Sequence, residues 1–356
     1  MNTRKLLSLA AALAVVGIGA LISRGGLDAS GTPAGQPQRS SPQPAGAPRS
    51  NPSATSPLSA EGSTLKIGSW NIEWLGKPDD RSGAAKGVAQ SPDDMADYIT
   101  GSGVAVLALE EIVAPGPGKP IRSRELEALT AAMKKKSGAT WDYVLFPGRA
   151  DGDQLTGVLW NTGAVTALNA AGKPWSQNSD SPWALPIPKG RSAKGSALWN
   201  RPPHAMKFSV GQGKTDFVVI VLHMKADYNG DFSTHRAEEA AALVAALPAV
   251  RKQFSDNDLV LIGDSNCSGE HEPAVAAFEA AKFIDLNAAH TPTHWQGGTM
   301  DRALVPSEQP EFAARSFSVF SDAYLSARKL TPRDYKRGYS DHYLITTTIR
   351  VMPDDD

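Results

Sequence analysis

The chain has 356 residues, and its 36 lysines and arginines almost balance its 37 aspartates and glutamates. The resulting formal net charge of −1 excludes a global positive field that would draw the protein to nucleic acid, so any such attraction must be local. The single cysteine, Cys267, excludes an internal disulfide and a cysteine cluster for zinc.

Residues 1–24 have the pattern of an export signal. Arg4 and Lys5 precede an uncharged apolar run from Leu6 to Ile22, which is short for a membrane span and slightly long for a signal-peptide core. A cleaved signal peptide and an uncleaved membrane anchor therefore both fit. Because the basic residues stay inside, either reading predicts that the rest of the chain is extracytoplasmic, whether secreted, periplasmic or anchored to the membrane.

Segment 25–63 is rich in Pro, Ser, Ala, Gly and Gln and has no aromatic residue, a composition typical of a disordered linker. The remaining residues, 64–352, suffice for one large α/β domain. In chain order, apolar runs predict strands and capping signals predict helices. Since the two alternate, we expect sheets packed inside helical layers, with 172–201 as a long surface excursion. The expected strands are 65–72, 104–109, 141–146, 157–160, 205–210, 217–222, 259–262, 302–305 and 343–349, and the expected helices start at 91 and 123 and cover 237–247 and 274–281.

Polar residues follow the buried strand 259–262. Asp264 and Asn266 alternate about Ser265, so both side chains can point to the same side of the sheet. A carboxylate there can take a proton from water, and the amide can donate to a phosphate oxygen. The alternative is an ordinary turn, because Gly, Asp, Ser and Asn all form turns.

Carboxylates at two other strand ends suit a hard cation. Glu110 and Glu111 follow a wholly apolar strand, and Asn71 and Glu73 share one face of the first strand. Oxygen ligands of this kind favour Mg²⁺, and Mn²⁺ or Ca²⁺ would also fit. Solvated loop residues are the alternative for each.

Two histidines near strand ends could stabilise phosphate charge or transfer a proton. Asp341 and His342 precede the last strand, where an imidazolium stabilises phosphate charge and a carboxylate approaches a metal. Asp301 could hold that imidazole in one tautomer, and His223, which ends a central strand, could act as a general acid. An ordinary strand-end aspartate and a core histidine are the alternatives.

Two basic stretches could form rims for a nucleic acid. The first holds Lys336 and Arg337, with Tyr335 and Tyr339 interleaved; the second lies in the excursion and ends at Arg201. Basic and aromatic side chains together suit a polynucleotide backbone and its bases. Solvated loops are the alternative.

Taken in order, these residues resemble the endonuclease/exonuclease/phosphatase superfamily, which has the deoxyribonuclease I-like fold. The resemblance spans 65–350 but departs from the family pattern at Glu110, where Gln is usual, and at Ser265 and Arg302. The matching motifs are Trp70-Asn71-Ile72-Glu73, Leu109-Glu110-Glu111, Gly157-Val158-Leu159-Trp160, Leu222-His223, Gly263-Asp264-Ser265-Asn266, Thr299-Met300-Asp301 and Ser340-Asp341-His342.

The resemblance implies a four-layered α/β sandwich, two packed mixed β-sheets flanked by helices, with Mg²⁺ at the strand ends. It implies Glu111 as the principal metal ligand, with Glu73 and Asp341 nearby. It further implies that Asp264 activates water. The phosphate would lie among Asn71, Asn266 and His342, with Asp301 orienting His342 and His223 matching a histidine of the deoxyribonuclease and phosphatase branches.

We therefore expect a metal-dependent phosphodiesterase, most simply an exported nuclease that acts on DNA or RNA. A phosphomonoesterase, phosphoinositide phosphatase or sphingomyelinase-like hydrolase of the same fold is the first alternative. A non-catalytic binding module of the cell envelope is the second. No obligate protein partner is evident, and we expect a monomer.

Overall fold

The computed structural model describes residues 62–113, 118–148, 153–228, 230–269 and 271–356. The predicted signal segment and nearly all of the predicted linker lie outside the described residues. Within the described part, no helix is both long and apolar enough to cross a membrane.

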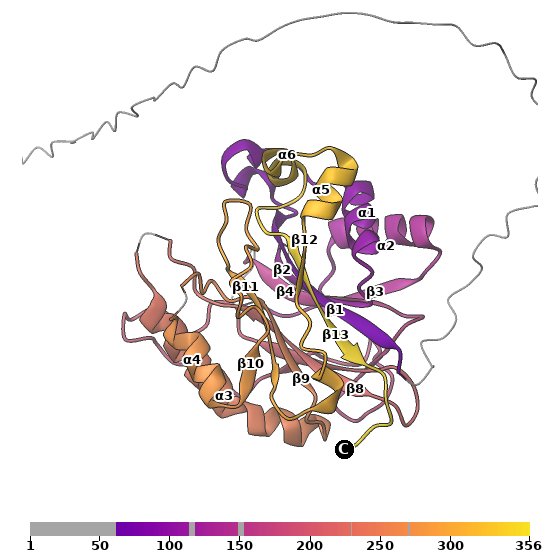
Figure 1. Ribbon diagram of the computed structural model, residues 1–356, viewed down its shortest axis with the longest axis vertical. Helices are drawn as coiled ribbons and strands as arrows, with labels where there is room; N and C mark the ends of the chain where they lie inside the picture. The colour runs from indigo at the N-terminus through magenta and orange to yellow at the C-terminus, as the bar shows by residue number, and fades with distance from the viewer. Residues whose placement is uncertain (1–61, 114–117, 149–152, 229, 270) are drawn as a thin grey trace, which may run out of the picture. The chain divides into compact units, whose positions relative to one another are not determined.

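Two mixed β-sheets form the centre of the domain (Figure 1). The first has the strand order β12-β13-β1-β2-β4-β3, with β1 and β2 parallel and the other pairs antiparallel. Its strands are β1 (Thr64–Leu75), β2 (Val106–Ile112), β3 (Trp141–Leu145), β4 (Leu155–Asn161), β12 (Ser318–Phe320) and β13 (Leu344–Arg350).

The second sheet has the order β10-β11-β9-β8-β7-β5, and β6 pairs with β7. Here β8 and β9 are the parallel pair. Its strands are β5 (Thr166–Leu168), β6 (Trp183–Ala184), β7 (His204–Ser209), β8 (Asp216–His223), β9 (Leu259–Asp264), β10 (Phe283–Asp285) and β11 (Asp301–Pro306).

Helices cover the outer face of each sheet, so the prediction of a four-layered sandwich is confirmed (Figure 1). One apolar cluster fills the space between the sheets, and one lies under each helical layer. The helices on the first sheet are α1 (Pro92–Ser102), α2 (Arg124–Ser137), α5 (Asp322–Arg328) and α6 (Pro332–Gly338); those on the second are α3 (Ser233–Phe254) and α4 (Pro273–Ala280). Short 3-10 turns are η1 (Pro78–Asp80), η2 (Gly83–Ala85) and η3 (Pro310–Phe312).

The predicted capping residues form the expected caps. The Ser91 and Ser123 hydroxyls accept from backbone N–H groups in the first turns of α1 and α2, and Gly138 ends α2 in the left-handed conformation. Helix α3 is longer than predicted, because it continues through Pro248. Its apolar face goes on beyond the proline, with Val250 and Phe254 buried in the outer cluster, and this packing offsets the lost hydrogen bond.

Candidate active site

The strand register brings the predicted polar residues to one edge of the two sheets. On the second sheet, Asp264 at the end of β9 lies opposite His223 of β8 and Asp301 of β11. On the first sheet, Asn71 of β1 pairs with Glu110 of β2. The Asn71 amide then bridges the sheets, since its Nδ2 donates to Asp264 Oδ2 at 3.1 Å.

Backbone strain is concentrated at this edge. Glu73, Trp74, Glu111 and Asn266 have φ values of 50°, 55°, 63° and 52°, in the left-handed region that non-glycine residues rarely adopt. The pairing of β1 with β2 shifts register at the same place. Such strain persists where the surrounding contacts enforce it, which is typical of functional sites.

Glu111 is oriented by this irregular backbone. Its Oε1 accepts from Asn71 Nδ2 at 3.2 Å and its Oε2 from the Trp74 backbone N–H at 3.2 Å. Burial, followed by the negative charge of Asp341, raises the pKa of Glu111 to about 7. A divalent cation would relieve that repulsion, and carboxylate oxygens are the ligands that Mg²⁺ prefers. Glu111 and Asp341 are thus the carboxylates that we expect to hold the predicted metal.

Asp264 is 2% exposed and its two oxygens are both hydrogen-bonded, Oδ1 by the Asn266 backbone N–H at 2.9 Å and Oδ2 by Asn71. Burial raises the pKa of Asp264 to about 6, although the neighbouring His342 works in the opposite direction. A carboxylate with a pKa near neutrality is a suitable general base.

His342 is paired with Asp301 as the resemblance implied. Its Nδ1–H donates to Asp301 Oδ2 at 2.9 Å, and its Nε2 lies 3.8 Å from Asp264 Oδ2. Burial opposes the charged imidazolium, but Asp301 and Asp264 overcome it and raise the pKa of His342 well above its usual value. The ring is therefore a cation whose orientation is fixed by the Nδ1–H bond to Asp301, so that its Nε2–H can be directed at an anion.

His223 and Arg201 approach the same carboxylates. His223 Nε2 lies 3.7 Å from Glu111 Oε1 and 4.0 Å from Asp264 Oδ2, and burial keeps the pKa of His223 well below its usual value. The imidazole is therefore neutral. The half-buried Arg201, whose guanidinium donates to the Met224 carbonyl at 3.4 Å, interacts electrostatically with Glu111 and Asp264.

Asn71 and Asn266, both predicted to donate hydrogen bonds to the phosphate, differ in whether they have a free N–H group. Both N–H groups of the Asn71 amide are used, one toward Glu111 and one toward Asp264, so Asn71 holds the carboxylates together. The Asn266 amide is half-buried and donates to the Met224 carbonyl at 3.1 Å, which leaves its second N–H for a ligand.

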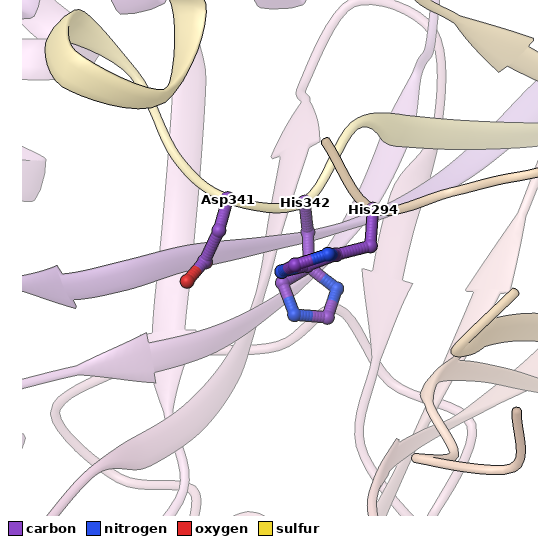
Figure 2. A group of neighbouring side chains, drawn as sticks. All are labelled: His294, Asp341 and His342. Carbon is purple, nitrogen blue, oxygen red and sulfur yellow. The ribbon is translucent and has the colours of Figure 1, made fainter. Parts of the chain in front are cut away.

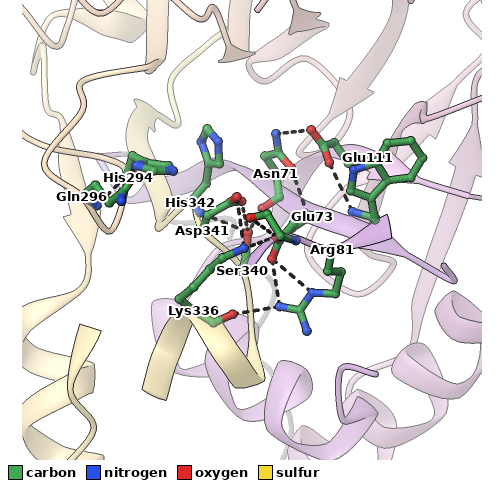
Figure 3. Close-up of polar contacts among 12 residues, drawn as sticks. Asn71, Glu73, Arg81, Glu111, His294, Gln296, Lys336, Ser340, Asp341 and His342 are labelled. Atoms are coloured by element: carbon green, nitrogen blue, oxygen red, sulfur yellow. Dashed lines mark hydrogen bonds and ion pairs between the residues drawn. The ribbon is translucent and has the colours of Figure 1, made fainter. Parts of the chain in front are cut away.

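Glu73, which the resemblance placed near the metal, is held by cationic side chains (Figure 3). Arg81 donates from Nε and Nη2 to Glu73 Oε2 at 3.1 and 3.0 Å, and the Ser82 N–H and the Lys336 ammonium occupy Oε1. The alternation that would put Glu73 beside Asn71 fails because the chain turns into the left-handed region at Glu73.

The prediction that Lys336 belongs to a basic rim for the substrate is contradicted by its burial. Its side chain is 2% exposed, and its ammonium is paired with Glu73 and with Asp341 Oδ2, the latter at 3.3 Å. Tyr335 and Tyr339 are buried in the aromatic core under α1 and α6, stacked at 5.1 Å. Helix α6 turns these residues inward, while Arg337 is exposed.

The predicted second rim, in the excursion 172–201, does not present its tryptophans to solvent either. Trp199 is buried in the outer apolar cluster against α3, and Trp183 is partly buried against the same cluster. The excursion is thus a cover for the second sheet, and Arg201 is the basic residue of that stretch which reaches the site.

His294 is a site residue that sequence reasoning missed. Figure 2 shows its ring beside that of His342, next to Asp341; the two ring centroids are 5.1 Å apart. Among the described residues, these three form one of the groups whose potential ligand atoms lie within 4.8 Å of one another, and none of those groups contains Glu73 or Glu111. The signal was weak, since His294 lies in a loop rather than at the end of a predicted strand.

Glu110, where the family pattern has Gln, is fully buried and accepts from the Ser69 hydroxyl at 2.7 Å. Burial raises the pKa of Glu110 well above its usual value. A protonated carboxyl group has nearly the shape of a glutamine amide, so this departure leaves the site intact.

No protein-family model matches the chain, and no curated protein matches its sequence significantly. Solved structures do share its fold. An endonuclease/exonuclease/phosphatase family protein from Bacteroides thetaiotaomicron matches 82% of this chain and 99% of its own, at 16% identity and a TM-score of 0.51. The human Nocturnin catalytic domain with bound sulfate matches 81% and 95%, at 14% identity and a TM-score of 0.52. A mannosyl-6-phosphatase from Bacteroides thetaiotaomicron matches 81% and 99%, at 17% identity and a TM-score of 0.50. The chain therefore has the fold of this superfamily.

Proposed function

We propose that this chain, which has the fold of the endonuclease/exonuclease/phosphatase structures, is a divalent-metal-dependent hydrolase of phosphate esters. One observation carries the proposal: Asp264 lies between Asn71 and the imidazolium of His342, which Asp301 fixes at 2.9 Å. A base with a pKa of about 6 beside a cationic donor suits attack of water on a phosphate.

In this mechanism Asp264 takes the proton of the attacking water. His342 and Arg201 direct positive charge at the phosphate oxygens, and the free N–H of Asn266 donates to one of them. A bound Mg²⁺ would supply Lewis-acid polarisation of the phosphate at Glu111 and Asp341. Neutral His223, 3.7 Å from Glu111, can orient water or donate to the leaving oxygen.

For the substrate we propose a phosphodiester of DNA or RNA. The support is the exposed basic side chain of Arg337 on α6, the helix that leads into Asp341, with exposed Arg333 on the same helix. Phosphates beyond the cleaved bond would contact these residues.

A small phosphomonoester is the second candidate. The burial of Lys336, Tyr335 and Tyr339 removes most of the rim that favoured a polynucleotide. A neighbour of the same fold is a mannosyl-6-phosphatase, and a narrower rim suits such a substrate.

We propose further that the chain is exported, on the pattern of residues 1–24, as a soluble protein or one held by an N-terminal anchor, and that it acts as a monomer. Fractionation of cells that express the full chain tests the location. Recovery in the cytoplasm would refute it.

A substrate panel tests the function. The full chain is assayed with plasmid DNA, RNA, sphingomyelin, inositol phosphates and a sugar phosphate, with Mg²⁺ and with chelator, and Asp264→Asn serves as the inactive control. We expect DNA or RNA to be cleaved fastest. Faster turnover of a monoester would overturn the nuclease assignment alone, whereas no turnover of any phosphate ester would overturn the hydrolase.

A further inference from the structure

A buried lysine occupies the side of the site that faces away from Glu111. The Lys336 side chain is 2% exposed, contacts the Glu73 carboxylate and lies 3.3 Å from Asp341 Oδ2 (Figure 3). Its ammonium therefore bridges two carboxylates, one of which, Asp341, also faces the predicted metal.

Glu73 is fixed in this arrangement from its other side. The Arg81 side chain, which is fully buried, donates to Glu73 Oε2, and the Ser82 N–H donates to Oε1 at 3.0 Å. Arg81 also ties the segment after β1 to α6 and to the chain beyond it, since it donates to the carbonyl oxygens of Val88, Lys336, Arg337 and Tyr339.

The charges of this group sum to zero. Glu73 and Asp341 contribute two negative charges, and Arg81 and Lys336 contribute two positive ones. The two carboxylates are thus already paired with cationic side chains. A second divalent ion between Glu73 and Asp341 would be repelled by the Lys336 ammonium and the Arg81 guanidinium.

We propose that the Lys336 ammonium takes the place of a second divalent cation, so that the site binds one ion, at Glu111 and Asp341. This inference rests on the proposed function. Two-metal phosphoesterase sites hold their ions about 3.5–4 Å apart between shared carboxylates. Here the carboxylate pair that would complete such a site is already bridged by the lysine. Lys336 is thus a positioning residue for Asp341.

Manganese stoichiometry tests the proposal. Mn²⁺ binding to the full chain is measured by calorimetry and electron paramagnetic resonance. The same measurement is made on the double variant Glu111→Gln/Asp341→Asn. Ions that this variant still binds lie elsewhere, for example at surface acidic clusters, and are subtracted, so that only ions of the site are counted. We expect one such ion in the wild type and two, spin-coupled, in Lys336→Met. Lys336→Arg and the matched control Arg333→Met, an exposed residue on the same helix, should keep one.

Each outcome decides a different point. Two site-specific ions in the wild type would overturn the role of Lys336, and this result needs no variant to fold. A folded Lys336→Met protein that still binds one ion would also overturn it. No site-specific ion in the wild type would instead refute the metal dependence of the proposed function.

Discussion

Asp264→Asn should lower turnover by orders of magnitude and make the protein more stable at neutral pH. Burial raises the pKa of Asp264 from 3.8 to about 6, so keeping it ionised at pH 7 costs about 3 kcal/mol of folding free energy. A carboxamide removes that cost. It has one acceptor oxygen where Asp264 uses two, so one buried hydrogen bond is lost, at about 1–2 kcal/mol. The net gain is about 1–2 kcal/mol.

The sign of this effect depends on pH. A carboxyl group whose pKa is higher in the folded than in the unfolded state lowers the free energy of unfolding only at pH values where it is ionised. For Asp264 this cost is absent below pH 3.8 and complete above about pH 6. Thermal melting in chelator at pH 4 and pH 8 should show the variant gaining a few degrees only at pH 8, at about 2–4 °C for each kcal/mol. Turnover should fall about 10²–10⁴-fold. A variant that is less stable at pH 8, or that keeps near-full turnover, would refute the reasoning.

Three further predictions follow from the same geometry. His342→Ala should fold and lose about 10²–10³ in turnover, because a preorganised donor is removed; an unchanged kcat would exclude its role. Chelator should abolish activity and Mg²⁺ or Mn²⁺ restore it, with apparent metal affinity falling as pH drops below about 7, since Glu111 then binds protons instead; affinity that is constant from pH 8 to 5.5 would contradict this. Deleting residues 1–61 should leave a folded, active enzyme, because β1 begins at Thr64; loss of the cooperative melt would show that the linker packs on the domain.

The strand ends could be predicted from sequence because burial leaves a local signature. The run before Asp264 is apolar on both faces, and β9 is a central strand of its sheet, so the first polar residue had to emerge at the sheet edge. The same argument placed His223 correctly, but in β2 the first polar residue, Glu110, stays buried and Glu111 reaches the edge. Helix α6 has a weaker signal in the sequence, because a short stretch dense in basic residues looks like a solvated loop despite the capping box at Thr331.

The fate of Glu73 and Lys336 could not be predicted locally. Strand alternation predicts that Glu73 shares a face with Asn71, but two consecutive left-handed residues, Glu73 and Trp74, end that alternation and redirect the chain. Lys336 pairs with a residue 263 positions away, and nothing in its own neighbourhood shows that its ammonium is buried. Arg81 lies in an irregular segment without periodicity, so its contacts with Glu73 depend wholly on the tertiary structure.

The distribution of charge ties these points together. On one side of Asp341, Lys336 and Arg81 neutralise the acidic groups, and no further cation is needed there. On the other side, burial raises the pKa values of Glu111 and Asp264, and the cationic His342 and Arg201 offset this effect only in part. A metal ion bound to the carboxylates would leave His342 and Arg201 free to pair with a phosphate. We therefore infer that substrate and metal bind to this edge with mutual assistance.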